Sequence, residues 1–419
     1  MVEPNASAAA DQRYCTERYG AMHRRALRSV ATQFFVNGVL FASVLPRLPE
    51  IRDRIAVSTG GIGWMLSVAG ASGLAASALA GPAMQRFGSR GLMLGASSLV
   101  CGSLALVGVS STPALVLVGL AGMVTFDVAV DIAMNLQGSI LSARRHSPVI
   151  NRLHGLWSLG AMVGGIAASR LTTMGVSLTA HFLGSAALMM VVLGYVGRGL
   201  LSQDEIPLRP LPVGPSGSAP HRHSPPDSNS KAARPVLVAL AVAGFFAVTV
   251  EGVPIDWAAF RLRDDLGATT GFAALGYVAV TAGMTLSRFA GDWALVRLGR
   301  TRFDQLSIGL AALGLGVASL MPGRVVVMGG LLVSGLGTAA LMPSMYDRAA
   351  HYRGRPGAGL GALTAGMRTA SIIVPTLVGS LAATRLGVGA AIAIVALPCV
   401  VGYLLAATSV HRSTTPSDP

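Results

Sequence analysis

Charged residues are scarce in this chain of 419 residues, because Asp, Glu, Lys and Arg together make up only 12% of it. Soluble globular proteins average about 25%, so the chain has too little polar surface to cover a water-soluble globule of this size. Hydrophobic residues account for 52% and recur in long runs along the whole sequence. These two features exclude a soluble fold and predict an all-α polytopic membrane protein.

Cysteine is also rare, and Cys15, Cys101 and Cys399 are too far apart to suggest a disulfide framework or a metal site. The sequence contains no H-E-x-x-H, P-loop or G-x-S-x-G pattern. We therefore expect no metal, no cofactor and no enzymatic activity, and the missing ATPase motif argues against a primary pump. A polytopic membrane enzyme or sensor is kept as a remote alternative.

Twelve apolar spans are predicted, six on each side of a central polar segment. They cover residues 27–46, 60–83, 91–110, 114–140, 153–173 and 177–197, then 236–256, 271–295, 304–321, 325–345, 357–384 and 387–409. The central segment is dense in Pro, Ser and charge, which is typical of a linker. The predicted parts are a cytoplasmic tail (1–26), a six-helix bundle (27–200), a cytoplasmic linker (201–235), a second six-helix bundle (236–409) and a cytoplasmic tail (410–419).

The basic residues are unevenly distributed among the connections between these spans. If both termini are cytoplasmic, 22 of the 32 basic residues lie on the inner side and eight on the outer side, as the positive-inside rule requires. A net charge of +14 would suit nucleic-acid binding only if it were clustered on a soluble domain. We predict a multi-pass protein of a bacterial cytoplasmic membrane, in contact with lipid and not with nucleic acid.

The two halves repeat at a constant offset of 211 residues. Phe34-Phe35 corresponds to Phe245-Phe246, and Arg52-Asp53 corresponds to Arg263-Asp264. Parallel six-span repeats of this kind imply a transporter built from two pseudo-symmetric bundles, with its site between them.

The fourth predicted span carries an acidic stripe. Asp127, Asp131 and Asn135 follow one another at steps of four residues and so share one face of a helix. A carboxylate at mid-bilayer costs about 2.5–3.5 kcal/mol, so this face should line a solute pathway. Two acids one turn apart in apolar surroundings resist ionising together and can exchange one proton. The alternative is a structural pair capped by neighbouring amides or hydroxyls.

Four further polar residues lie within predicted spans. Gln33 and Asn37 recur on one face of the first span, where they could contact a polar solute or bond neighbouring helices. Glu251 could be a second titrating group, or could lie at headgroup level beside Asp256 and the interfacial anchor Trp257. Arg368 should pair with an intramembrane acid or bind an anionic solute.

Twelve spans in two repeated halves resemble the major facilitator superfamily, whose loop after span 2 reads roughly G-x-L-x-D-R-x-G-R-R. The resemblance implies gating roles for the residues that match this loop, and for a hypothetical partner of Asp292, the acid of the second half. The alternative is that these charges only set the membrane topology and have no gating role. These residues are Gly81, Arg86, Gly88 and Arg90 in the first half, Arg288, Gly291, Asp292, Arg297 and Gly299 in the second half, and Arg152 as the partner. Gln85 replaces the family's acid in the first half.

Three stretches resemble the sugar-porter-like branch that includes fucose permease and many bacterial relatives. They are Asp127–Asn135, Asn151–Gly165 and Glu251–Gly267. The resemblance implies alternating access of a small polar solute coupled to protons, with Asp127 or Asp131 as the coupling acid and the monomer as the working unit. Uptake by symport is favoured over the alternative, export of a metabolite or drug by proton antiport.

Overall fold

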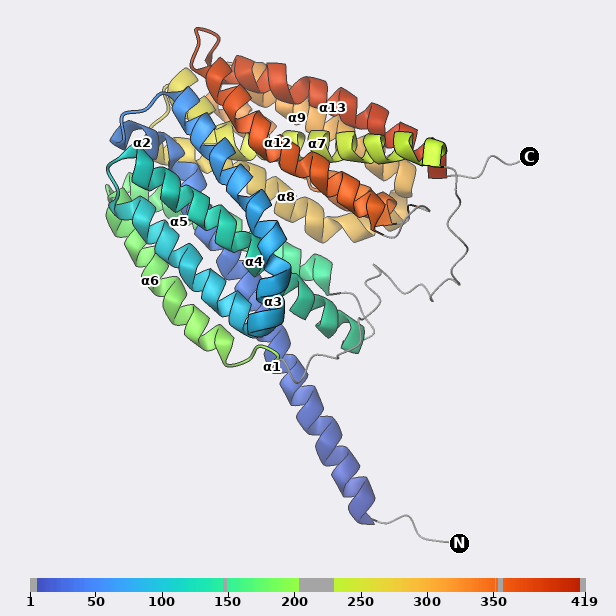
Figure 1. Cartoon of the computed structure of the whole chain (residues 1–419). Coiled ribbons are helices and arrows are strands. Elements are labelled where there is room, and N and C mark those ends of the chain that lie inside the picture. Colours follow the sequence, from blue (N-terminus) through green and yellow to red (C-terminus); the bar gives the residue numbers. More distant parts are fainter. Residues whose placement is uncertain (1–5, 146–148, 203–229, 351, 353–356, 415–419) are drawn as a thin grey trace, which may run out of the picture.

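The computed structural model describes residues 6–145, 149–202, 230–350, 352 and 357–414, and these residues form helices without any strand (Figure 1). The first half contains α1 (Ala6–Val44), η1 (Leu45–Arg47), α2 (Leu48–Arg54), α3 (Thr59–Val109), α4 (Pro113–Arg145), α5 (Ile150–Thr173) and α6 (Leu178–Gly197). The second half contains α7 (Ser230–Phe260), the π-helical turn η3 (Arg261–Asp265), α8 (Thr270–Leu298), α9 (Arg300–Leu320), α10 (Arg324–Thr338), α11 (Leu341–Ala350), α12 (Ala358–Ala382) and α13 (Gly387–Thr414).

The helices of the described residues account for twelve crossings. Ten stretches are long and apolar enough to span a membrane. The stretch Thr59–Val109 contains two of the predicted spans, because the helical backbone is broken at Gly88, which has a φ of +65°. The helix α5 supplies the remaining crossing. This agrees with the predicted all-α fold. One difference is that α1 begins at Ala6, within the predicted N-terminal tail, and so extends well before the predicted span.

The crossings form two bundles, α1–α6 and α7–α13, which meet along two helix pairs (Figure 1). At this interface α3 packs on α12 and α5 packs on α8. The bundles converge at the end that carries α2, called here the α2 end, and diverge toward the end where α13 finishes (Figure 1). Each interface pair joins a helix of one repeat to a helix of the other, as parallel repeats require.

Small residues let the helices within each bundle approach closely. A side chain at Gly160 of α5 would collide with the backbone carbonyl of Phe35 in α1, and one at Gly366 of α12 would collide with that of Ala241 in α7. Helix association in a membrane depends on such close packing, because lipid tails are as apolar as the helix surfaces. The side chains of Leu79 and Val296 are highly exposed, which fits a surface covered by lipid.

Candidate functional site

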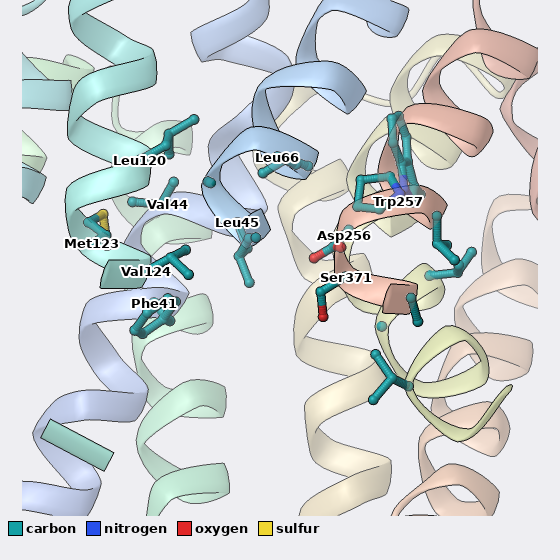
Figure 2. A pocket seen from close by; sticks show the side chains of 18 of the residues that line it. Phe41, Val44, Leu45, Leu66, Leu120, Met123, Val124, Asp256, Trp257 and Ser371 are labelled. Atoms are coloured by element: carbon teal, nitrogen blue, oxygen red, sulfur yellow. The ribbon is translucent and has the colours of Figure 1, made fainter. Parts of the chain in front are cut away.

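A cavity of about 290 Å³ lies between the two bundles (Figure 2). One wall comes from α1, α3 and α4 and includes Phe41, Leu66 and Met123, and the other comes from α7 and α12. Most of the lining side chains are apolar. The polar ones are Asp256 and Trp257 of α7 and Arg368 and Ser371 of α12. A small apolar cavity with a few polar groups is the usual form of a small-molecule site.

The acidic stripe of α4 lies beside this cavity. Asp127 is half-buried and accepts a hydrogen bond of 2.7 Å from Nδ2 of Asn37 in α1. Asp131 is exposed and accepts a hydrogen bond of 2.8 Å from Nδ2 of Asn135. Val124, about one turn before Asp127, lines the cavity wall. Three of the predicted site residues, Asn37, Asp127 and Asp131, are therefore brought to the inner face of the first bundle, and Asn135 follows them along α4.

Arg368 reaches across the interface from α12 toward this stripe. It interacts electrostatically with both Asp127 and Asp131. Its Nη1 atom lies 3.5 Å from the place where a Cβ on Gly73 of α3 would be, so the absence of a side chain at Gly73 leaves room for the guanidinium. The sequence could not name the partner of Arg368; the structure provides two acids from the opposite bundle.

A second set of charged residues lies at the interface, where Arg288 of the second bundle contacts α5 of the first. Glu251 of α7 forms an ion pair with Arg288 of α8, with 3.5 Å between Oε1 and Nη2. Arg288 also donates a hydrogen bond to Ser158 of α5 and lies 5.9 Å from the ring centroid of Trp157. The charge of Glu251 is therefore paired with that of Arg288 at the interface between the bundles. Tyr346 of α11 interacts electrostatically with Glu251, Asp131 and Arg368, so the two charged groups are neighbours.

Two polar interactions hold the α2 end of the interface together. Arg52 forms an ion pair with Asp264, and Arg263 forms one with Asp53. In addition, the hydroxyl of Thr376 in α12 donates to the hydroxyl of Ser67 in α3 at 2.8 Å. The cavity is therefore closed toward the α2 end by contacts between the bundles.

Gln33 takes one of its two predicted placements, and Trp257 lies elsewhere than predicted. Gln33 is buried inside the first bundle, where Nε2 donates to the hydroxyl of Ser97 at 2.8 Å. It does not line the cavity, and its placement favours the bond between helices over contact with a solute. The sequence predicts Trp257 at the membrane surface, but the residue is fully buried and lines the cavity. That prediction is wrong, because α7 continues beyond Trp257 through Phe260 into the π-helical turn η3.

Sequence reasoning misses three residues at the site. It treats Asp256 only as a headgroup-level residue and does not single out Ser371 or Tyr346. A signal for Asp256 exists: the charged cluster Arg261–Asp265 begins about one and a half helical turns later and marks the true end of the span. Ser371 and Tyr346 have no distinguishing pattern in the sequence.

Comparison with known families confirms the predicted superfamily. A family model described as the Major Facilitator Superfamily matches residues 30–355, well over half of the chain. The chain belongs to this superfamily. It is 26% identical over 307 residues to an uncharacterised MFS-type transporter of Yersinia pestis, in an alignment that covers 73% of this chain and 75% of that protein.

Solved structures share the fold at low sequence identity. A bacterial homologue of the human lysosomal transporter Spinster, in an inward-facing and unoccupied conformation, matches 94% of this chain and 97% of its own with a TM-score of 0.63 and 13% identity. A variant of the fucose:proton symporter FucP of Escherichia coli matches 93% of this chain and 98% of its own with a TM-score of 0.57 and 15% identity. Both comparisons establish the major facilitator fold.

The loop signature of the superfamily has a structural counterpart in both halves. Gly88 and Gly299, separated by the repeat offset of 211, adopt positive φ angles of +65° and +72°, which side chains other than glycine rarely tolerate. Each ends one helical segment and begins the next. The shared conformation at repeat-related positions supports the repeat predicted from the sequence.

The other predicted gating residues are spread over several elements. Arg86 lies 5.6 Å from the ring centroid of Phe87, and Arg297 lies 5.3 Å from that of Trp293. Arg288 is in the interior of α8, where it pairs with Glu251. The remaining members are Gly81 and Arg90 in α3, Arg152 in α5, which is exposed, and Gly291 in α8. The side chain of Asp292 lies outside the part of the chain that the structure describes, so its predicted pairing with Arg152 stays a prediction.

Proposed function

We propose that this protein is a secondary active transporter that moves a small solute across a bacterial cytoplasmic membrane by alternating access, coupled to protons. The cavity between the bundles supplies the solute site, and the helix pairs α3–α12 and α5–α8 supply the surfaces that rock against each other. The apolar lining with a few polar groups favours a compact solute with one polar end and an apolar body.

The arrangement of the bundles corresponds to an inward-facing state in this proposal. The surplus of arginine in the connections on the side of the termini predicts that both termini are cytoplasmic. The α2 end, closed by two ion pairs between the bundles, is then the outer end.

Proton coupling is assigned to Asp127 and Asp131, and one observation carries it. Two carboxylates one turn apart on α4 interact with a single arginine, Arg368, from the opposite bundle. Two acids and one base are neutral only when one proton is bound. A neutral group is far easier to enclose in an apolar interface than a net charge. The bound proton therefore favours closure of the cavity, and its release favours opening.

The coupling assignment is tested with Asp127→Asn, Asp131→Asn and the double variant in proteoliposomes. The solute is first identified by a thermal-stabilisation screen of sugars, amino acids and antibiotics at two pH values. We expect the wild type to accumulate the solute when a pH gradient is imposed. At least one single variant should lose this accumulation but keep exchange of labelled for unlabelled solute. Asp347→Asn, in an ion pair with Arg300 at the surface, is the matched control.

Accumulation like that of the wild type in both single variants and in the double variant would refute the assignment. The same vesicles separate the two directions of transport. If an inward proton gradient drives uptake into right-side-out vesicles, the protein is a symporter. If the same gradient drives efflux, it is an antiporter and hence an exporter. Symport is the direction we propose, on the resemblance to the fucose permease branch.

A further inference from the structure

Asp256 presents a carboxylate to the cavity that no protein group neutralises among the residues the structure describes. It belongs to α7 and lines the wall formed by the second bundle. In Figure 2 its oxygen atoms point into the space between the bundles, on the side where Ser371 also lies. Among the described residues, Asp256 has neither a hydrogen-bond partner nor an ion-pair partner. The neighbouring phenol of Tyr277 is a weak acid and adds no positive charge.

The other charged groups near the cavity are already compensated. Arg368 faces the two carboxylates of Asp127 and Asp131, and Glu251 is paired with Arg288. Within the described part of the chain, Arg288 forms no ion pair with Asp256, and Arg368 interacts with the two acids of the first bundle. An isolated carboxylate in an apolar site is costly unless a partner arrives. The partner of Asp256 should therefore come with the occupant of the cavity.

We infer that Asp256 binds the protonated amine of the transported solute, and that the solute is a small organic amine with a compact apolar body. The inference rests on the proposed transport function, which places the solute in this cavity. Phe41, Leu66 and Met123 on the opposite wall would contact the apolar body.

The size of the cavity limits the solute further. Its volume of about 290 Å³ is at the lower end of the usual range for ligand sites, roughly 300–1,000 Å³. A carboxylate–ammonium contact in such a site provides orientation as well as affinity, because charge-assisted hydrogen bonds are short and directional. An uncharged solute of the same shape would leave Asp256 unpaired and should bind more weakly.

The test uses the full chain purified in detergent and measures thermal stabilisation by matched small molecules. The probes are 2-phenylethylamine, cyclohexylmethylamine and 1-aminobutane, each compared with the alcohol and the carboxylate of the same carbon skeleton. For at least one skeleton we expect the amine to stabilise the wild type at a concentration at least about tenfold lower than the alcohol. In Asp256→Asn this preference should disappear. Asp347→Asn, which neutralises a carboxylate outside the cavity lining, should keep it.

Several results would overturn the inference. These are equal stabilisation by amine and alcohol, an amine preference that survives in Asp256→Asn, or no stabilisation by any of the amines. Stabilisation by sodium chloride over potassium chloride that depends on Asp256 would assign the carboxylate to an inorganic cation instead. The melting temperature of Asp256→Asn without any probe shows whether this variant is folded. If it is not folded, Asp256→Glu replaces it in the test: this variant keeps the charge and should retain the amine preference.

The binding readout does not require transport. A wild-type protein without amine selectivity, or a selectivity that survives in Asp256→Asn, therefore overturns this inference and leaves the proposed transport function in place. If amines bind through Asp256 but no solute exchanges across proteoliposomes, the transport function fails and the binding site stands.

Discussion

Arg47 of η1 is a buried charge that partners from neighbouring elements hold in place. Its side chain is only 2% exposed. The guanidinium donates to both carboxylate oxygens of Glu50 at 3.0 and 2.6 Å and to the backbone carbonyl of Val176 at 3.0 Å. It also lies 3.2 Å from Nδ1 of His181 in α6. One side chain thereby ties the connection after α1 to the connection between α5 and α6.

We expect Arg47→Met to destabilise the protein by about 3–5 kcal/mol, because it leaves Glu50 as a charge without its partner. The measurement is the free energy of unfolding in detergent micelles. The double variant Arg47→Met/Glu50→Gln removes both charges and should recover part of the loss. Arg385→Met, at an exposed site near the same end of the molecule, is the control. A free energy of unfolding of Arg47→Met equal to that of the wild type would contradict the role assigned to this arginine.

At the scale of residues, the sequence constrains a position most where a charge has only one plausible environment. Two acids on one face of α4 could be placed beside the interface because exposing a carboxylate to lipid is energetically costly. Gln33 was less determined, since an amide is satisfied equally by a solute or by another helix. Four residues also advance the helix by slightly more than one turn, so Gln33 and Asn37 point to different neighbours, Ser97 and Asp127.

At the scale of elements, the crossing of α3 and α12 depends on the absence of side chains. A Cβ on Gly63 would collide with the carbonyl oxygen of Pro375, and one on Gly70 would collide with that of Ser371. Ser67, between these glycines, accepts hydrogen bonds from the hydroxyl and the backbone N–H of Thr376 at 2.8 and 3.0 Å. We expect this close fit to be lost when the α2 end opens.

We expect Gly63→Val to prevent this close fit and to shift the protein toward a state that is open at the α2 end. The reporter is a cysteine at Ser371 in a background without the three native cysteines. A maleimide that cannot cross membranes should modify it faster from the α2 side than in the parent. The control is Gly102→Val, because a side chain at Gly102 meets nothing within 4 Å. An unchanged rate in Gly63→Val would mean that this crossing does not close the cavity.

The helices themselves were largely predictable because each span must be apolar and about 20 residues long. The breaks were harder to foresee. Gly88 was correctly placed in a connection, since its surroundings matched a known loop signature. The interruption between α10 and α11 at Ala339–Ala340 and the π-helical turn after α7 have no such signature. Neither position carries a glycine or proline that would have marked it in the sequence.

At the scale of the whole molecule, the repeat and the gate are the same feature. Arg52-Asp53 and Arg263-Asp264 are equivalent positions of the two halves. In the structure each arginine pairs with the aspartate of the other half. A two-fold axis between the bundles makes this exchange automatic, because any contact from the first half to the second has a mate in the reverse direction. The repeat in the sequence predicted the bundles, but the exchanged pairing required the structure.

The last prediction follows from that symmetry. We expect Arg52→Gln and Asp264→Asn each to speed modification of the Ser371→Cys reporter from the α2 side. The double variant should be no faster than the single variants, since both remove the same ion pair. Partly exposed pairs contribute about 0.2–1 kcal/mol each, which corresponds to a change in rate of roughly 1.4- to 5-fold. Arg385→Gln, at the same end, is the control and should leave the rate unchanged.

The equivalence of the two ion pairs provides the strictest test of this prediction. Arg263→Gln and Asp53→Asn should reproduce the effect of Arg52→Gln and Asp264→Asn, because each set opens one of two matched contacts. Raising the ionic strength to about 1 M, where the Debye length falls to about 3 Å, should bring the parent closer to the variants. If only one pair affects the rate, closure at this end is asymmetric and the two halves do not share the gate. If the effects of Arg52→Gln and Asp264→Asn add up in the double variant, the two residues act independently and their ion pair does not hold the α2 end closed.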